Sequence, residues 1–184
     1  SLAKLVSKER MSQEDADAAR ARISTAIDRS SCSDADLVVE AVPEILDLKL
    51  SIFAELDGIC KPECILATNT SSISISEIAA ATSRPSKVIG MHFMNPVPIM
   101  KLIEVINGSD TDADVTEAVI EASEKMGKIP LCCNDSPGFV SNRILCPMIN
   151  EAILPCNLQE HRLVLLADNP FEKATFSKRS LDVL

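Results

Sequence analysis

The sequence predicts an α/β fold built on a doubly wound parallel sheet. Short apolar strands alternate with helical segments from about residue 35 to residue 154, which is the pattern of β-α-β units. The strand predicted over residues 35–41 is almost continuously apolar, as expected of a strand that is covered on both faces. With 184 residues, the chain has room for one domain and part of a second.

Helices are assigned where apolar residues recur every three or four positions, and strands where apolar runs are short. Ser12 is expected to cap a helix that restarts after residue 11, with Asp15 three residues on, and Thr111 to cap a later helix. Gly58 is expected to end the helix before it. In chain order, the predicted elements are helical residues 1–21, strands 22–27 and 35–41, helix 44–57, strand 63–68, helix 76–81, strands 87–92 and 101–107, helix 111–126, strand 128–132 and helix 139–154.

Composition narrows the function classes. The net charge is -9 and no cluster of Lys and Arg is present, which argues against nucleic acid and anionic membranes as partners. No apolar run is long enough to span a bilayer. The first residues include neither an initiator Met nor a signal peptide, so the sequence reads as the middle of a longer protein.

The cysteines indicate the compartment. Their number is seven, which is odd, and the pairs Cys60/Cys64 and Cys132/Cys133 do not have the spacing of a zinc site. We expect free, buried thiols, no metal, and an intracellular, reducing compartment. Cytoplasm, mitochondrion and peroxisome all remain open.

One histidine and one acid suggest chemistry. The chain has two histidines. His92 ends an apolar run, a Pro-rich turn follows, and Glu104 then lies between Ile103 and Val105. A buried carboxylate costs free energy unless it has a partner. If the turn brings His92 back against Glu104, the pair is suited to general acid–base catalysis near neutral pH.

Polar residues follow three successive predicted strands. Glu40 and Glu44 come after the first strand, residues 69–72 (Asn-Thr-Ser-Ser) after the second, and His92 and Asn95 after the third. In an open parallel sheet, ligands bind beyond the carboxyl ends of the strands. The sequence therefore predicts a binding site at this rim.

Four motifs carry a family resemblance: Val38–Ala41, Asn69–Ile75, Gly90–Val105 and Ser136–Arg143. Together they resemble the L-3-hydroxyacyl-CoA dehydrogenase family, with the greatest likeness to its short-chain, 3-hydroxybutyryl-CoA type. The resemblance implies an incomplete Rossmann-type sheet followed by the start of an all-helical domain. It divides the chain into a partial NAD-binding domain (1–133), the start of the helical domain (134–154) and a divergent tail (155–184).

The resemblance also implies catalytic roles. His92 matches the general base that takes the proton of the substrate's 3-hydroxyl while hydride leaves for NAD. Glu104 matches the carboxylate that orients this histidine. Ser71 and Asn142 match residues that hydrogen-bond near the reacting oxygen. Asn95 matches a residue that holds nicotinamide and substrate in register.

Further positions match binding residues of the family. Glu44, Lys49, Asn69 and Ser71 are expected to contact NAD. Ser1 and Lys8 fall where the family's helical arm touches the CoA moiety of an acyl-CoA substrate, and a lysine facing a phosphate is chemically sensible. His161 matches no functional position.

The chain departs from the family at both ends. None of its five glycines fits the G-x-G-x-x-G turn that binds the dinucleotide pyrophosphate, so the first β-α-β unit is expected to be missing and NAD binding to be weak. Residues 155–184 do not resemble the helical domain that forms the family's homodimer. Three hypotheses follow: a segment of a working NAD-dependent dehydrogenase, a catalytically silent truncated product, or a dehydrogenase of a free hydroxy acid or sugar acid.

Overall fold

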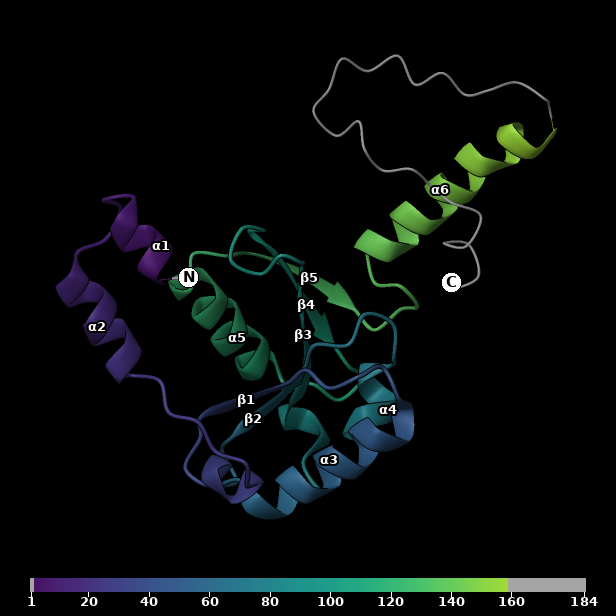
Figure 1. Cartoon of the computed structure of the whole chain (residues 1–184). Helices are drawn as coiled ribbons and strands as arrows, with labels where there is room; N and C mark the ends of the chain where they lie inside the picture. The colour runs from purple at the N-terminus through teal and green to yellow at the C-terminus, as the bar shows by residue number, and fades with distance from the viewer. Residues whose placement is uncertain (1, 159–184) are drawn as a thin grey trace. The chain divides into compact units, whose positions relative to one another are not determined.

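The computed structural model describes residues 2–158, and the expected α/β class is confirmed. Five strands form one sheet in the order β1-β2-β3-β4-β5 (Figure 1). The strands are β1 (Leu37–Glu40), β2 (Ile65–Thr68), β3 (Val88–Phe93), β4 (Leu102–Asn107) and β5 (Ile129–Asn134). The helices are α1 (Leu2–Ser7), α2 (Gln13–Ala21), α3 (Leu46–Ile59), α4 (Ile75–Ala79), α5 (Ala113–Lys125) and α6 (Ser141–Leu158), with short 3₁₀ turns at Arg29–Cys32 and Pro85–Lys87.

One strand pair runs against the prediction of a parallel sheet. The pairs β1–β2, β2–β3 and β4–β5 are parallel, but β3 and β4 are antiparallel. The loop of residues 94–101 joins these two strands. A parallel connection needs a crossover of about a dozen residues or more, so this loop is too short for one. The antiparallel register places His92 directly opposite Glu104.

Helices cover both faces of the sheet, as the doubly wound class requires. On one face, Phe53 of α3 and Ile75 of α4 pack in a core with Leu66 and Val88. On the other face, α5 packs in a second core that contains Ala67, Ile89, Val115 and Val119. Successive strand residues alternate between the two cores, as the pleat dictates. Figure 1 shows α5 on the opposite side of the sheet from α3 and α4.

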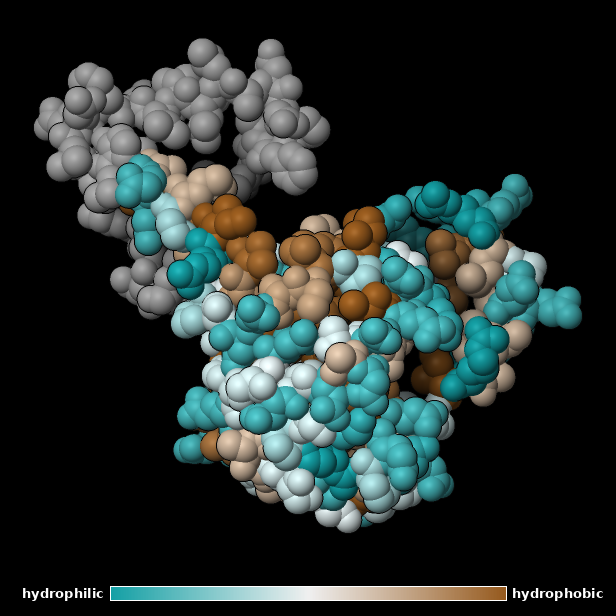
Figure 2. All heavy atoms as spheres, turned by 180° about the vertical axis from the view of Figure 1, so that it is seen from behind, coloured by the Kyte–Doolittle hydropathy of each residue, from teal (hydrophilic) through white to brown (hydrophobic). Residues whose placement is uncertain are grey.

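The chain divides into two compact units, Ser1–Arg143 and Ile144–Leu184. The first contains the whole sheet. The described part of the second is the remainder of α6, where Ile144, Leu145 and Met148 are exposed. On the face that Figure 2 shows, apolar residues gather in several brown areas among mostly hydrophilic ones. Within residues 2–158, none of the helices is long and apolar enough to cross a membrane. The division expected at residue 133 stays a prediction.

Three local expectations fail for physical reasons. Residues 22–27 form no strand among the described residues, and Ile27 is fully exposed; a strand needs a neighbour for its backbone hydrogen bonds, and this segment has none. Gly58 does not end α3, which continues to Ile59, because a single glycine costs a helix only about 1 kcal/mol. Thr111 does not cap α5, whose first flanking residue is Asp112. The Thr111 hydroxyl instead accepts from the Gly108 N–H and donates to the Val88 carbonyl.

The predicted helix restart at Ser12 is confirmed. The Ser12 Oγ accepts a hydrogen bond from the Asp15 N–H at 3.0 Å, where α2 begins. This is the capping arrangement expected from a serine followed three residues later by an acid.

Gly90 allows the closest approach in the core. A Cβ at this position would lie 2.8 Å from the Ile106 Cβ and 2.9 Å from the Ile75 Cδ1. We therefore expect Gly90→Ala to lower the free energy of unfolding by about 1–3 kcal/mol, because overpacking forces neighbours apart. Gly58→Ala is the matched control: nothing lies within 4 Å of its Cβ, so it should raise stability by up to about 1 kcal/mol. Urea unfolding measures both, and equal stability of the two variants would contradict the prediction.

Candidate active site

His92 and Glu104 meet as the sequence indicates. They lie opposite each other on the antiparallel strands β3 and β4, and His92 Nδ1 is 2.8 Å from Glu104 Oε2. His92 is 7% exposed and Glu104 is fully buried. A neutral imidazole that donates its Nδ1–H to a carboxylate leaves Nε2 with a free lone pair. The pair therefore presents a proton acceptor at Nε2.

Two backbone groups complete the environment of the acid. Glu104 Oε1 accepts hydrogen bonds from the N–H groups of Val140 (3.0 Å) and Ser141 (2.8 Å), just where α6 begins. Gly138 makes the turn before them, with a φ of 77° that glycine adopts without steric cost. Phe139, 3% exposed, lies against the imidazole, with ring centroids 5.9 Å apart.

These contacts determine the ionisation of the acid. Burial favours the neutral carboxyl group and opposes ionisation, but the hydrogen bonds from His92, Ser141 and Val140 outweigh it. They hold the pKa of Glu104 below its ordinary value. Glu104 is therefore a carboxylate at neutral pH, as a partner for an imidazolium must be.

This pKa shift predicts a pH dependence of stability. A group whose pKa is lowered by folding contributes stability above its ordinary pKa of 4.5 and loses it as the pH falls through the folded value. We expect the free energy of unfolding to decrease in this acid range, with Asp57 and Asp135 adding in the same direction. Urea unfolding between pH 7 and pH 3 measures it. Glu104→Gln should make the decrease shallower, and an unchanged slope would contradict the assignment.

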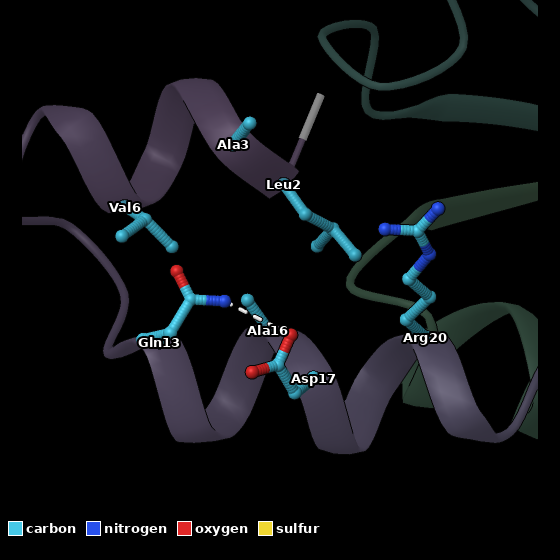
Figure 3. A pocket seen from close by; sticks show the side chains of 7 residues that line it. All are labelled: Leu2, Ala3, Val6, Gln13, Ala16, Asp17 and Arg20. Atoms are coloured by element: carbon cyan, nitrogen blue, oxygen red, sulfur yellow. Dashed lines mark hydrogen bonds between the residues drawn. The ribbon is translucent and has the colours of Figure 1, made fainter.

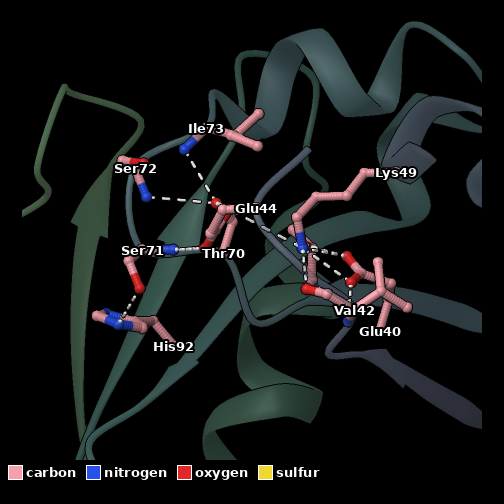
Figure 4. Close-up of polar contacts among 10 residues, drawn as sticks. Glu40, Val42, Glu44, Lys49, Thr70, Ser71, Ser72, Ile73 and His92 are labelled. Carbon is pink, nitrogen blue, oxygen red and sulfur yellow. Dashed lines mark hydrogen bonds and ion pairs between the residues drawn. The ribbon is translucent and has the colours of Figure 1, made fainter. Parts of the chain in front are cut away.

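Ser71 is held from three directions, and Figure 4 shows two of these contacts, those with His92 and Glu44. Its Oγ lies 3.2 Å from His92 Nε2, its N–H donates to Glu44 Oε1 at 2.6 Å, and its carbonyl accepts from Asn142 Nδ2 at 3.2 Å. The structure thus brings four of the predicted residues together at one place. A hydroxyl and an imidazole nitrogen there can both reach one oxygen of a ligand.

Beyond Glu44 lies an ion pair that the sequence did not reveal. Glu40, 4% exposed, accepts from Lys49 Nζ at 2.8 and 3.0 Å, from the Val42 N–H and from the Thr68 hydroxyl. Lys49 is fully buried, and its Nζ lies 4.0 Å from Glu44 Oε2 (Figure 4). The ammonium group that was expected to face NAD is thus engaged inside the protein. A contact between Lys49 and NAD stays a prediction.

The other predicted rim residues lie at the ends of neighbouring strands. Asn69 follows β2, and its Oδ1 accepts a hydrogen bond from the Phe93 N–H at 2.8 Å, which ties the ends of β2 and β3 together. Asn95 follows β3 and is exposed. Their contacts with NAD stay predictions.

The expected CoA-binding positions belong to the first two helices. Lys8 is exposed, directly after α1. Between α1 and α2 lies an open hollow of about 320 Å³, and Lys8 is not part of its lining (Figure 3). The hollow is lined by Leu2, Ala3, Val6, Gln13, Ala16, Asp17 and Arg20. Ser1 and His161 lie outside the described residues.

The expectation of buried thiols is only partly correct. Cys60 and Cys64 are buried, whereas Cys132 and Cys146 are exposed. Burial raises the pKa of the Cys64 thiol to about 11. Cys132 lies on the edge strand β5, and Cys146 lies on α6 in the second unit. The sequence pattern missed this exposure because an apolar run does not reveal which of its residues another element covers.

The fold defines a class of protein. A mainly parallel five-stranded sheet with helices on both faces is the arrangement of a Rossmann-like dehydrogenase fold. Residues 1–136 match the family model of the 3-hydroxyacyl-CoA dehydrogenase NAD binding domain. The chain belongs to this family.

Relatives are similar over most of this chain. A probable 3-hydroxybutyryl-CoA dehydrogenase of Deinococcus radiodurans is 56% identical over 132 residues, which is 72% of this chain and 48% of that protein. A 3-hydroxybutyryl-CoA dehydrogenase of Clostridioides difficile is 48% identical over 83% of this chain and 54% of its own. The crystal structure of (S)-3-hydroxybutyryl-CoA dehydrogenase PaaH1 from Ralstonia eutropha superposes with a TM-score of 0.82 at 46% identity, covering 86% of this chain and 56% of that one. The chain thus spans about half the length of these relatives.

Proposed function

We propose that this chain is the catalytic segment of an NAD-dependent enzyme that oxidises L-3-hydroxyacyl-CoA to 3-ketoacyl-CoA, with a short-chain substrate of the 3-hydroxybutyryl type. The observation that carries the proposal is the alignment of Ser71, His92 and Glu104, with His92 Nδ1 on the acid and Nε2 at the serine. Family membership and the names of the relatives support the substrate class.

The residues divide the chemistry among them. Oxidation at C3 breaks a C–H bond, whose electron pair leaves as hydride, and an O–H bond, whose proton must be accepted. We assign the proton to His92 Nε2, while Glu104 stabilises the imidazolium that forms. Ser71 and Asn142 hold the reacting oxygen near His92. NAD, when bound, supplies the hydride acceptor.

The residues present fit one end of NAD. Asn95 is exposed at the rim, and the Glu44 side chain is 41% exposed there, so both can reach the nicotinamide and its ribose. The pyrophosphate end is different, because none of the five glycines forms a G-x-G-x-x-G turn. We therefore assign the nicotinamide end to this segment and the pyrophosphate end to a part of the enzyme outside it.

The partners proposed follow from the family. The acyl-CoA would contact Ser1 and Lys8, and homodimerisation would depend on a helical domain that this segment only begins. Six of the cysteines carry free thiols, which supports a reducing, intracellular compartment.

We expect the 184-residue chain to bind NADH weakly or not at all. The pyrophosphate contributes much of a dinucleotide's affinity through a helix N-terminus, and that unit has no counterpart here. Fluorescence titration with NADH measures it. Saturable binding at micromolar NADH would contradict this expectation.

The catalytic proposal needs a chain that also carries the dinucleotide turn. We define a chimera in which residues 1–143 replace the matching segment of the Ralstonia eutropha enzyme. It should reduce acetoacetyl-CoA with NADH. Activity on free hydroxy acids alone would overturn the CoA assignment, and a folded chimera that binds NADH but is inactive on both would favour a catalytically silent segment.

A further inference from the structure

We propose that Glu40 and Lys49 are positioning residues for Ser71, acting through Glu44. This inference deepens the proposed function and rests on it for its catalytic meaning. Its structural content, the ordering of one serine by a buried ion pair, stands on contacts among Glu40, Lys49, Glu44 and Ser71 alone.

The first step is the fixed position of the lysine. Glu40 Oε1 and Oε2 both accept from Lys49 Nζ, and the Val42 carbonyl accepts from the same ammonium at 3.3 Å. Glu40 is itself anchored by the Val42 N–H at 2.6 Å and the Thr68 hydroxyl at 2.8 Å. With side-chain exposures of 2% and 0%, neither charge has access to solvent as an alternative partner. The ammonium therefore stays where Glu40 holds it.

The second step is the carboxylate of Glu44. Its side chain is 41% exposed, so water competes for its oxygens. Yet it accepts two directed hydrogen bonds, from the Thr70 hydroxyl at 2.8 Å and from the Ser71 N–H at 2.6 Å. Lys49 Nζ lies 4.0 Å from Glu44 Oε2. Attraction to this fixed charge favours the rotamer in which Glu44 makes both bonds.

The third step is the serine. Glu44 fixes the Ser71 N–H while Thr70, held by the same carboxylate, accepts from the N–H groups of Ser72 and Ile73. This orders the loop after β2 and keeps Ser71 Oγ 3.2 Å from His92 Nε2. The ion pair thus influences the active site without touching His92. A helix lysine and a strand acid that serve only stability would leave Ser71 unaffected.

The test uses the 184-residue chain and nuclear magnetic resonance. The main variant is Glu40→Gln with Lys49→Met, because replacing both members of a buried pair by uncharged groups of similar size usually preserves the fold. The first readouts are the hydrogen-exchange rate and the proton chemical shift of the Ser71 amide. The second readout is the pair of ¹⁵N chemical shifts of the His92 imidazole, measured in a His161→Gln background so that His92 is the one histidine left. Neither needs cofactor or activity, so failure here is distinct from failure of the proposed function.

Without the fixed ammonium, Glu44 should leave the rotamer that accepts from the Ser71 N–H. We therefore expect the Ser71 amide to exchange about tenfold faster in the pair variant, because a hydrogen bond to a charged group is worth at least that factor. The ¹⁵N chemical shifts of the His92 imidazole should change in the same variant. Core amides of β2 and β4 should change little. Glu44→Gln should have the same effect, and combining it with the pair variant should add nothing further.

Asp57→Asn is the matched control. It breaks another sequestered ion pair, between Asp57 and Arg84 at 2.6 Å, in a place that does not contact Ser71. It should lower global stability without a specific change at Ser71. The proposal is overturned if the pair variant leaves Ser71 unchanged while Glu44→Gln alters it, if all amides change uniformly as in the control, or if the pair and Glu44 effects are additive.

Discussion

Replacing His92 with glutamine in the chimera is expected to lower kcat for acetoacetyl-CoA reduction by about 10²–10⁴-fold, the usual contribution of general acid–base catalysis. Glutamine can keep a hydrogen bond to Glu104, but it cannot exchange a proton with the substrate oxygen near neutral pH. KM should change much less, because the His92 side chain is only 9% exposed and contributes little binding surface. Steady-state kinetics with saturating NADH measures both constants.

The control for this experiment is Asp57→Asn in the same chimera. It removes an ion pair with Arg84 on a part of the chain that makes no contact with His92, so kcat should stay near its original value. An unchanged kcat in the His92→Gln chimera would remove His92 from the mechanism.

Replacing Glu104 with leucine is expected to lower the free energy of unfolding of the 184-residue chain by about 3–5 kcal/mol. The fully buried carboxylate satisfies the imidazole and the N–H groups of Val140 and Ser141. Without it, the buried imidazole and two half-buried N–H groups lose their acceptor, and an unsatisfied polar group costs about 1–3 kcal/mol when it is buried. Urea unfolding at pH 7 measures the difference.

Glu104→Gln separates hydrogen bonding from charge. Its side-chain carbonyl can still accept from the two backbone N–H groups, so it should retain most of the stability that leucine loses. In the chimera, however, it should still lower kcat, because an imidazolium no longer has a carboxylate beside it. Equal stability of the leucine and glutamine variants would show that these hydrogen bonds contribute little.

Much of the site was predictable because it depends on local sequence. His92 and Glu104 flank a loop of residues 94–101 that is too short for a crossover, so proximity followed from the chain itself. Ser71 lies three residues after the end of β2, which pairs with β3, so it was expected at the same rim. The antiparallel direction of β4 was missed, although the same short loop required it.

The contacts that the sequence did not predict join groups whose separation in space cannot be derived from the sequence pattern. Glu40 and Lys49 are nine positions apart across a strand, a loop and a helix, and a lysine among apolar helix residues resembles a solvated one until the packing of α3 is known. The Val140 and Ser141 amides that bind Glu104 are backbone groups, which carry no residue signature. Gly138 was the one sequence feature that indicated the turn orienting these two N–H groups toward Glu104.

The three hydrogen bonds around Ser71 have a consequence for the entropy of binding. Its N–H and carbonyl are each already paired with a side chain, so the loop after β2 gives up its freedom when the protein folds. Ordering one backbone residue costs about 1–2 kcal/mol. Ser71 is therefore already ordered before a substrate binds, and the free energy of binding does not include the cost of ordering it.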